Sequence, residues 1–185
     1  MDRLAIILYL AVHVLLIIYL LYIVVRLWPV LLYAKQTLPY VPITPAAAKL
    51  LANLPELSRP HTIIDLGCGT GTLLAGVAHV RPDAELIGVD IKSSLVRMAT
   101  WRSRFWKNRP RLLVGDMFDY DLSGVDAVVG WWVPVFGERL LPKLKAECKA
   151  GCVVAVYMFP LPQDPEFSYR QVKKGKIILH VYQRL

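Results

Sequence analysis

The sequence predicts an α/β fold with helices on both faces of a mostly parallel sheet, preceded by one apolar N-terminal helix. Three observations lead to this expectation: an apolar run at the start of the chain, short runs rich in valine and isoleucine that alternate with helical segments, and a glycine-rich turn directly after the first of those runs. Strands covered on both faces read as continuous apolar runs, because neither face meets water. The chain of 185 residues has room for one compact domain and an appendage.

The first element is the apolar run from Leu4 to Val25, in which His13 is the one strongly polar residue. A run of this length spans the hydrocarbon core of a bilayer as a helix. A cleaved signal peptide is the alternative, but its apolar region is shorter and ends in a small-x-small cleavage site, and residues 25–29 offer none. We therefore expect residues 1–28 to form a transmembrane anchor that is not cleaved.

The charges that flank this run favour one orientation. Arg26 and Lys35 follow the run, whereas Arg3 precedes it together with the terminal amine and is opposed by Asp2. Because positive residues are enriched on the cytoplasmic side of membrane segments, the pattern favours a folded domain in the cytoplasm. The three cysteines show no metal-ligand spacing and read as reduced thiols, so no metal site is expected.

The next segment, residues 29–60, reads as an interfacial linker followed by a short helix. Prolines at 39, 42 and 45 break regular structure. Thr44 is a suitable N-cap residue, with Pro45 at the first helical position. We expect the helix to cover residues 46–54.

Strands and helices then alternate through residues 61–185, which we expect to form the main domain. The expected strands cover residues 62–66, 85–89, 111–114, 125–130 and 152–159, and the expected helices cover 72–80, 93 to about 107, and 138–148. Residues 167–173 and 176–182 alternate in polarity around a Lys-Gly turn, which predicts a β-hairpin. The helix between the third and fourth strands is nearly absent, so this is a small version of the fold.

The net charge of +8 is spread unevenly along the chain. Between Asp90 and Asp116 there is no acidic residue but seven basic ones, interleaved with Trp101, Phe105 and Trp106. Nucleic-acid binding, contact with anionic lipid headgroups and a merely solvated helix face all explain such a segment.

The glycine-rich turn carries the most information about function. It reads Asp65-Leu66-Gly67-Cys68-Gly69-Thr70-Gly71, or D-x-G-x-G-x-G, and not the G-x-G-x-x-G of dinucleotide-binding folds. Glycines let the backbone approach a ligand where a Cβ atom would clash. The motif resembles motif I of the class I methyltransferases that depend on S-adenosylmethionine (SAM). This resemblance implies a Rossmann-like sheet of seven strands with an antiparallel C-terminal hairpin, and SAM as the cofactor.

The expected cofactor site lies at the carboxyl ends of the first three strands, where ligands of open α/β sheets bind. The resemblance implies that Asp65 orders the turn and binds the methionine ammonium, that Asp90 binds the ribose hydroxyls, and that Asp116 meets the adenine amino group. Ile91 would pack on the adenine, and the glycines would give the ligand access to the backbone. The candidate cofactor-binding residues are Asp65, Gly67, Cys68, Gly69, Gly71, Asp90, Ile91, Asp116 and Met117.

Methyl transfer is an in-line displacement at a sulfonium methyl group and needs no catalytic nucleophile, so positioning and desolvation carry most of it. A lysine acceptor must lose its proton, which costs about 4.6 kcal/mol at pH 7 from an ordinary pKa near 10.4; aromatic walls lower that pKa by burial. Residues 130–134 lack the N/D-P-P-Y/F motif of the amino-methyltransferases of adenine, cytosine and glutamine. The candidate acceptor-pocket residues are Trp131, Trp132, Pro134, Tyr40 and Thr44, and ordinary core packing is the alternative for the two tryptophans.

Four further segments extend the resemblance: residues 39–45 (Pro-Tyr-Val-Pro-Ile-Thr-Pro), Ser94-Leu95-Val96, Val133-Pro134, and residues 159–162 (Phe-Pro-Leu-Pro). Together with the N-terminal apolar run, they are similar to the membrane-anchored protein-lysine methyltransferases of mitochondria. The known substrates of that family are the ATP synthase c subunit and the adenine nucleotide translocase, and prokaryotes carry shorter relatives.

Two departures from that family keep the SAM chemistry but weaken the transfer of substrate identity. Cys68 and Thr70 stand where its members often carry serine and aspartate, and Asp90 stands where they carry glutamate. We therefore expect SAM-dependent methylation of a lysine in a membrane-associated protein. A methyltransferase for a membrane-dissolved small molecule, such as a lipid headgroup or a quinone, is the alternative, and a SAM-binding protein without turnover is a third.

The expected partners are the lipid bilayer and a membrane-protein substrate, and nucleic acid is not expected. The expected location is a membrane crossed once, with the catalytic domain in the cytoplasm. The chain shows no mitochondrial presequence, so the inner membrane of a prokaryote is favoured over a mitochondrial membrane.

Overall fold

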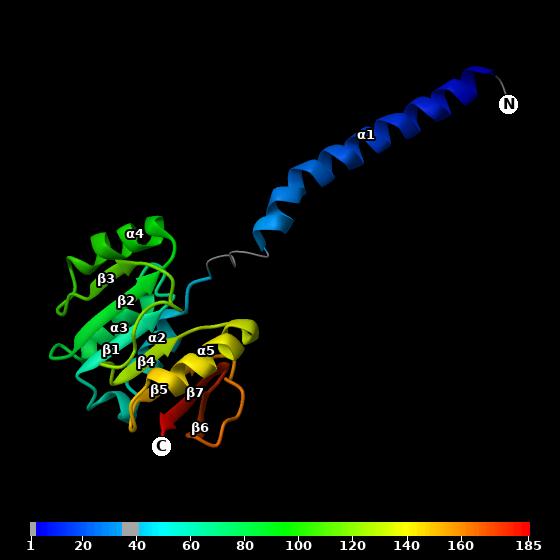
Figure 1. Ribbon diagram of the computed structural model, residues 1–185. Helices are drawn as coiled ribbons and strands as arrows, with labels where there is room; N and C mark the ends of the chain where they lie inside the picture. The colour runs from blue at the N-terminus through cyan, green and yellow to red at the C-terminus, as the bar shows by residue number, and fades with distance from the viewer. Residues whose placement is uncertain (1–2, 35–40) are drawn as a thin grey trace. The chain divides into compact units, whose positions relative to one another are not determined.

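The computed structural model describes residues 3–34 and 41–185, and in the first helix it describes the side chains at positions 6, 9, 10 and 12–24. The chain divides into two compact units, one up to Val41 and one from Pro42 to Leu185. The first unit holds the helix α1, from Arg3 to Ala34 (Figure 1). Tyr40, one of the predicted acceptor-pocket residues, lies outside the described residues.

The prediction of a single-pass membrane protein, with an anchor at residues 1–28 and a catalytic domain in the cytoplasm, is wrong. A helix that crosses the hydrocarbon core needs about 20 consecutive, predominantly apolar residues. Within the part of the chain that the structure describes, no helix has the length and apolarity needed to cross a membrane.

The second unit carries the predicted alternation of strands and helices (Figure 1). Its helices are α2 (Pro45–Ala52), the short 3₁₀ helix η1 (Pro55–Leu57), α3 (Thr72–Val80), α4 (Ser93–Ser103) and α5 (Pro134–Glu147). Its strands are β1 (Thr62–Leu66), β2 (Glu85–Asp90), β3 (Arg111–Val114), β4 (Ala127–Gly130), β5 (Val153–Tyr157), β6 (Phe167–Lys174) and β7 (Ile177–Arg184).

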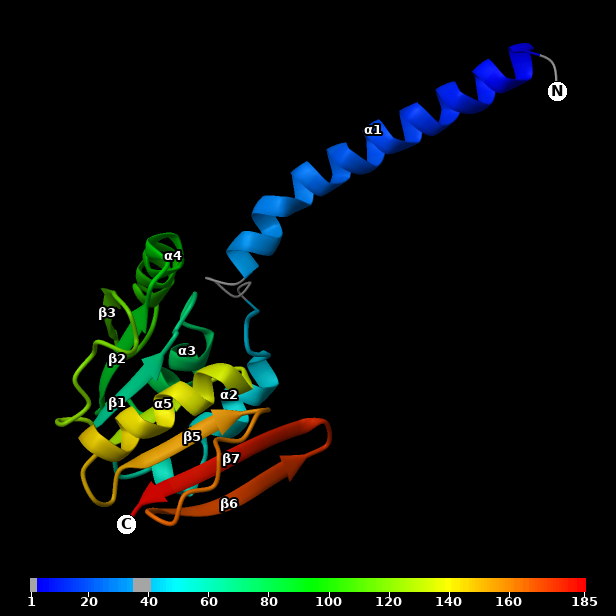
Figure 2. The ribbon, with the colours of Figure 1, turned by 45° about the vertical axis from the view of Figure 1, so that its right-hand side comes forward.

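The strands form one seven-stranded sheet in the order β3-β2-β1-β4-β5-β7-β6 (Figure 2). The first five strands pair in parallel, and the β6–β7 hairpin adds to β5 in antiparallel pairing. This confirms the predicted α/β sheet with its antiparallel C-terminal hairpin. The strand order reverses at β1, which has β2 on one side and β4 on the other, and ligands of open α/β sheets bind outside the carboxyl ends of the strands at such a point.

Two hydrophobic cores lie on the two faces of the sheet. Residues of α2 and α3 pack on one face and residues of α5 on the other. Successive residues of β5 point alternately into the two cores. Ala155 belongs to the core under α2 and α3, whereas Val154 and Val156 belong to the core under α5. This explains why the strands read as continuous apolar runs in the sequence.

Two helices differ at one end from the predicted elements. α5 begins at Pro134 and not at Glu138, because proline is favoured at the first helical position, where its missing N–H has no intrahelical partner to lose. α4 ends at Ser103 and not near Lys107, and the residues after it form a turn. Between β3 and β4, the described residues 115–126 form turns and no helix, as predicted.

Candidate functional site

The glycine-rich turn lies at the carboxyl end of β1, where the strand order reverses. Gly67, Gly69 and Gly71 have left-handed φ angles of 79°, 54° and 74°, which residues with a Cβ atom rarely adopt. A Cβ atom on Gly67 would meet nothing within 4 Å, whereas one on Gly71 would come within 2.8 Å of the Trp106 ring. A ligand can therefore reach the backbone at Gly67. At Gly71 a larger residue would instead collide with the Trp106 ring.

Asp90, the last residue of β2, fastens this turn to the neighbouring strand. Its Oδ2 atom accepts a hydrogen bond from the N–H of Gly69 at 2.8 Å, and its Oδ1 atom accepts one from the N–H of Lys92 at 2.8 Å. The N–H of Gly67 donates to the carbonyl of Val89 at 2.8 Å. Because a carboxylate offers about four lone-pair sites, each oxygen of Asp90 keeps capacity for a ligand hydroxyl group.

Asp65, one residue before the end of β1, is a buried carboxyl group beside the glycine turn. Its side chain is 3% exposed, and no described residue donates a hydrogen bond to it. Burial raises the pKa of Asp65 to about 8, with the nearby charge of Asp90 as the second cause. A buried acid in this state is stabilised by a positively charged group, so the position suits a ligand that carries an ammonium group.

The basic segment contributes one of its residues to the turn, which the sequence does not predict. Arg102 of α4 donates to both the carbonyl and the hydroxyl oxygen of Thr70, each at 2.8 Å. Trp106 covers Gly71 from the same side. By contrast, Trp101 is 60% and Phe105 78% exposed. In the basic segment, Arg102 and Trp106 thus contact the glycine turn, whereas Trp101 and Phe105 lie on the surface.

The other predicted cofactor residues lie in three different environments. Cys68 is buried in the core under α3, and burial raises the pKa of its thiol. Ile91 is 60% exposed at the end of β2, where an apolar ligand group could cover it. Asp116 is exposed after β3 and accepts a hydrogen bond from the N–H of Phe118 at 3.0 Å. Met117 packs against the core under α5. Within the described residues, no group of histidine, cysteine and acidic residues could hold a metal ion.

The two adjacent tryptophans after β4 have different roles. Trp132 is 3% exposed and belongs to the core under α5. Its Nε1–H donates to the carbonyl of Leu66 at 2.8 Å, and its ring lies directly over Gly130. Trp132 is therefore a core residue that joins β4 to the end of β1. Its place in an acceptor pocket stays a prediction.

Trp131 packs on the opposite face of the sheet, against the core under α2 and α3. Its ring lies 6.3 Å from that of Tyr157, at the end of β5. The Nε1–H group of Trp131 is buried and has no hydrogen-bond partner among residues 3–34 and 41–185. Of the other predicted acceptor residues, Pro134 is exposed at the start of α5, and Thr44 is exposed at the start of α2, where its hydroxyl caps the helix. The structure thus brings Trp131 and Tyr157 together and leaves Trp132 out.

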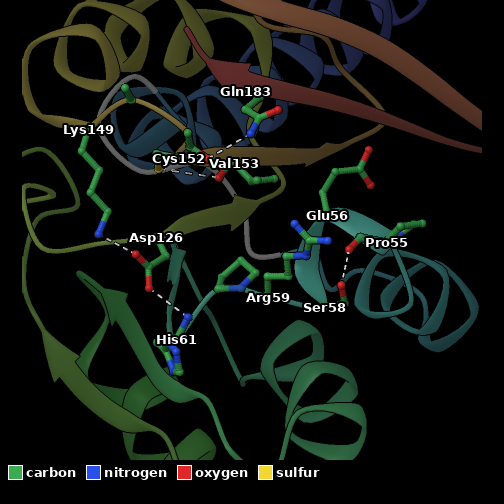
Figure 3. Close-up of a pocket in the computed structure, with 13 residues that line it drawn as sticks. Pro55, Glu56, Ser58, Arg59, His61, Asp126, Lys149, Cys152, Val153 and Gln183 are labelled. Atoms are coloured by element: carbon green, nitrogen blue, oxygen red, sulfur yellow. Dashed lines mark hydrogen bonds and ion pairs between the residues drawn. The ribbon is translucent and has the colours of Figure 1, made fainter.

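A separate hollow of about 650 Å³ lies at the opposite, amino ends of β1, β4 and β5 (Figure 3). Its two carboxylates are already committed to ion pairs, Glu56 with Arg170 and Asp126 with Lys149. Asp126 also accepts hydrogen bonds from the backbone N–H groups of residues 61 and 62, at 2.8 and 2.9 Å. These bonds align β1 with β4, so both carboxylates of this hollow serve the fold.

Comparison with known proteins identifies the family of the chain. The family model described as ANTKMT methyltransferase domain matches residues 65–166, which is more than half of the chain. The match begins at Asp65 and therefore includes the glycine turn, Asp90 and the segments that follow β4 and β5.

Two relatives and one solved structure add detail. A protein-lysine N-methyltransferase of Saccharolobus islandicus (strain REY15A) is 26% identical over 125 residues, or 66% of this chain and 78% of that protein. A carboxy-S-adenosyl-L-methionine synthase of Campylobacter fetus subsp. fetus (strain 82-40) is 31% identical over 122 residues, 63% of this chain, which thus spans about half (52%) of that protein. An RNA methyltransferase of Salinibacter ruber in complex with S-adenosyl-L-homocysteine matches with a TM-score of 0.64 at 22% identity, covering 78% of this chain and 94% of that one, which shows the fold.

Proposed function

The chain belongs to the family of the ANTKMT methyltransferase domain, and we propose that it transfers the methyl group of SAM to the side-chain amine of a lysine in a protein. The domain is a SAM-dependent methyltransferase domain, and SAM is its cofactor. The lysine acceptor is our addition. It is supported by the similarity to a protein-lysine N-methyltransferase and by the chemistry at the ends of β4 and β5.

The cofactor fits one half of the sheet, which we call the cofactor half: β1 to β3 and the loops that follow them. SAM carries an ammonium group, a ribose with two hydroxyls, and a sulfonium from which the methyl group leaves. Asp65 is a buried carboxyl group that accepts no hydrogen bond from a described residue, and it lies beside a stretch of backbone at Gly67 that faces open space. Asp90 holds the turn and keeps lone pairs for the ribose hydroxyls. The exposed side chain of Ile91 can cover one face of the adenine.

The observation that carries the lysine proposal is the absence of charge on the other half, which we call the acceptor half: β4, β5 and the segments that follow them. Residues 131–137 and 157–163 contain no acidic and no basic residue. Trp131 and Tyr157 provide aromatic surface at this place. An amine in apolar surroundings is easier to deprotonate, because burial disfavours the ammonium form.

In the proposed reaction, the neutral lysine nitrogen attacks the methyl carbon in line with the carbon–sulfur bond. The carbon–nitrogen bond forms as the carbon–sulfur bond breaks, S-adenosylhomocysteine leaves, and the proton of the amine passes to water. The chain contributes orientation through Asp65 and Asp90 and a dry, aromatic approach through Trp131. Such positioning can supply about 7–11 kcal/mol of a barrier.

The test uses the full chain, SAM labelled in its methyl group, and an extract of cells that lack the gene. We expect label in protein, and hydrolysis of that protein should release methylated lysine that mass spectrometry identifies. Asp65→Asn, which removes the acid without changing its size, should abolish the label. Asp119→Asn, an exposed acid in the loop after β3, is the matched control and should not change it.

Two results would contradict the proposal. Label in lipid or in a small molecule, with none in protein, would show that the acceptor is a membrane-dissolved small molecule. SAM binding without transfer to any fraction of the extract would show that the chain binds SAM without turnover.

A further inference from the structure

The chain takes an unusual backbone conformation directly after β5. Met158 has a φ angle of 72°, and it is the one residue other than glycine in the described part of the chain with a positive φ angle. Residues with a Cβ atom adopt this region rarely, and they stay in it when the surrounding structure holds them there. Such positions cluster at functional sites.

β7 holds Met158 by both of its backbone groups. The N–H of Met158 donates to the carbonyl of Ile178 at 2.9 Å. The carbonyl of Met158 lies 3.1 Å from the Nε2 atom of His180, whose side chain is 3% exposed. Because a carbonyl only accepts hydrogen bonds, Nε2 must carry the proton.

Tyr169 of β6 fixes His180 in that form. The Tyr169 hydroxyl lies 2.9 Å from the Nδ1 atom of His180. With the proton on Nε2, Nδ1 of the neutral ring is the acceptor and the hydroxyl is the donor. The two rings are stacked, 6.0 Å apart with an angle of 13° between their planes. The bonds therefore run in one direction, from Tyr169 to His180 to Met158.

Tyr182, a second residue of β7, binds the backbone of Leu161, three positions after Met158. The hydroxyl of Tyr182 accepts from the N–H of Leu161 at 2.9 Å and donates to its carbonyl at 3.3 Å. Tyr182 is 4% exposed, and its ring lies 5.0 Å from that of Tyr169. Residues 158–161, which we call the acceptor segment, are thus held at both ends by buried side chains of β7.

The acceptor segment borders the acceptor half of the proposed site. Gly130 of β4 pairs with Val156 of β5, so the residues that follow the two strands lie side by side. Trp131 and Tyr157 are in ring contact at this place, and Met158 comes next. The Met158 backbone therefore lies beside the place that we propose for the methyl acceptor.

We propose that His180 is a positioning residue for the methyl acceptor: together with Tyr169 and Tyr182, it keeps the acceptor segment in the one conformation that admits the acceptor beside Trp131. The inference rests on the proposed function for the identity of the acceptor. It assigns to the C-terminal hairpin, which carries no residue of the cofactor half, control over acceptor binding.

The test compares three variants. His180→Phe removes both hydrogen bonds of the ring. His180→Gln keeps an N–H that can donate to the Met158 carbonyl and serves as the rescue. Tyr169→Phe removes one hydroxyl from an exposed side chain, so it is expected to fold even if His180→Phe does not. His79→Phe, which changes an exposed histidine at the end of α3, is the matched control.

The first measurement does not depend on activity. The chain has four methionines, so an NMR spectrum of the protein labelled with ¹³C at the methionine methyl groups contains few signals, and the Met158 signal can be assigned by substitution. We expect His180→Phe to shift the Met158 signal and His180→Gln to restore it. In ¹⁵N-histidine spectra, Tyr169→Phe should change the signals of the His180 ring, which report its tautomer.

The second measurement compares the effect of each variant on acceptor binding with its effect on cofactor binding. With extract of cells that lack the gene as acceptor, we expect the half-saturating extract concentration to rise by about tenfold or more in His180→Phe. The affinity for S-adenosylhomocysteine should stay within about twofold. Label is counted in protein and in lipid separately, so the comparison of variants holds for whichever fraction accepts the methyl group.

Three results would overturn the inference. An unchanged Met158 signal in both His180→Phe and Tyr169→Phe would show that the hydrogen bonds do not hold the segment. A shifted signal with unchanged acceptor saturation would show that the segment does not meet the acceptor. An equal loss of cofactor and acceptor binding would show that the hairpin supports the fold alone. If the acceptor is not a lysine of a protein, the label appears in lipid and not in protein, and this result is distinct from the three above.

Discussion

The two halves of the sheet edge differ in charge and in how their loops are held. In the cofactor half, Asp65 lies one residue before the end of β1, Asp90 ends β2 and Asp116 follows β3, and hydrogen bonds to backbone groups hold the loops. In the acceptor half, the segments after β4 and β5 are apolar and uncharged, and they are held by bonds from buried side chains, Trp132 in one case and His180 in the other. One half thus carries acids at its strand ends, whereas the segments of the other carry no charged side chain.

This difference indicates where each kind of specificity resides. A charged, hydroxylated cofactor is recognised by groups that must be placed accurately, so the turn around Gly69 is fastened to Asp90. An amine that must lose its proton is served by the absence of polar groups. Substitutions in the two halves should therefore produce different defects, and the predictions below are ordered from the largest expected effect to the smallest.

The largest effect is expected for Asp90→Ala in the cofactor half. The change removes the hydrogen bonds from Gly69 and Lys92, and bonds to charged groups contribute about 1.5–3 kcal/mol each. We expect the affinity for SAM to fall by about a hundredfold or more. Isothermal titration calorimetry measures it, with Asp119→Ala as the control. An unchanged affinity would remove Asp90 from the site.

Trp132→Ala tests whether the halves are structurally independent. Because the ring is buried in the core and its Nε1–H binds the end of β1, we expect the free energy of unfolding to fall by about 3–5 kcal/mol. SAM binding should weaken along with stability. Urea denaturation measures the effect, and Trp101→Ala, at an exposed position, should change stability by less than about 0.5 kcal/mol. Loss of methylation with stability and SAM affinity intact would instead return Trp132 to the acceptor pocket.

The pH dependence of SAM binding should distinguish the acids of the cofactor half. With its pKa raised to about 8, Asp65 is mostly protonated at pH 7 in the free protein. The ammonium group of bound SAM lowers the pKa of Asp65, so binding releases a proton. The affinity for SAM therefore rises by at most about tenfold per pH unit, until the pH exceeds the pKa of Asp65 in the free protein. Calorimetry in buffers of different ionisation enthalpy counts the proton. Asp65→Asn should remove the pH dependence, and a wild type without it would contradict the role of Asp65.

The raised pKa of Asp65 also makes the stability of the free protein depend on pH, and here the stability falls as the pH rises. The folded chain keeps the Asp65 proton up to about pH 8, whereas the unfolded chain releases it near the ordinary value of 3.8. The contribution of Asp65 to the free energy of unfolding therefore falls as the pH rises between these values. Urea denaturation of wild type and Asp65→Asn at several pH values measures it, and SAM should reduce the difference.

The smallest effect on stability is expected for Trp131→Phe in the acceptor half. The indole N–H of Trp131 is buried without a partner, and such a group destabilises the fold. We expect the substitution to change the free energy of unfolding by less than about 1 kcal/mol, or to raise it slightly. Methylation of the acceptor should weaken by less than about tenfold while SAM affinity stays unchanged. A large loss of stability would mean that Trp131, like Trp132, serves the core.

The sequence predicts the sheet, the glycine turn and the acids around it because these features are local. A strand, a turn of required glycines and an acid at a strand end are all visible within a few residues. The distinction between Trp131 and Trp132 could also have been found, since neighbouring residues of an extended chain point to opposite faces. The prediction that failed, the membrane anchor, rests on the apolar run of residues 4–25, on the missing cleavage site and on the resemblance to membrane-anchored methyltransferases.

The remaining contacts depend on residues that are far apart in the chain. Arg102 reaches the glycine turn from thirty-two positions away, and His180 reaches Met158 from twenty-two. Neither arginine in a basic segment nor histidine in a hairpin strand carries a local signal of such a role. These contacts become visible only when the strand order and the register of β7 are known.

The two ends of the sheet have a consequence for self-association. β3 and β6 are the edge strands, and an edge strand offers unpaired backbone groups to another chain. β3 has only four residues, and β6 carries Lys173 and Lys174 on its exposed length, whereas its Arg170 is paired with Glu56. Two copies that approached through β6 would bring positive side chains together, which disfavours the pairing. Added salt screens such repulsion, so concentrated protein should stay dispersed best at low ionic strength.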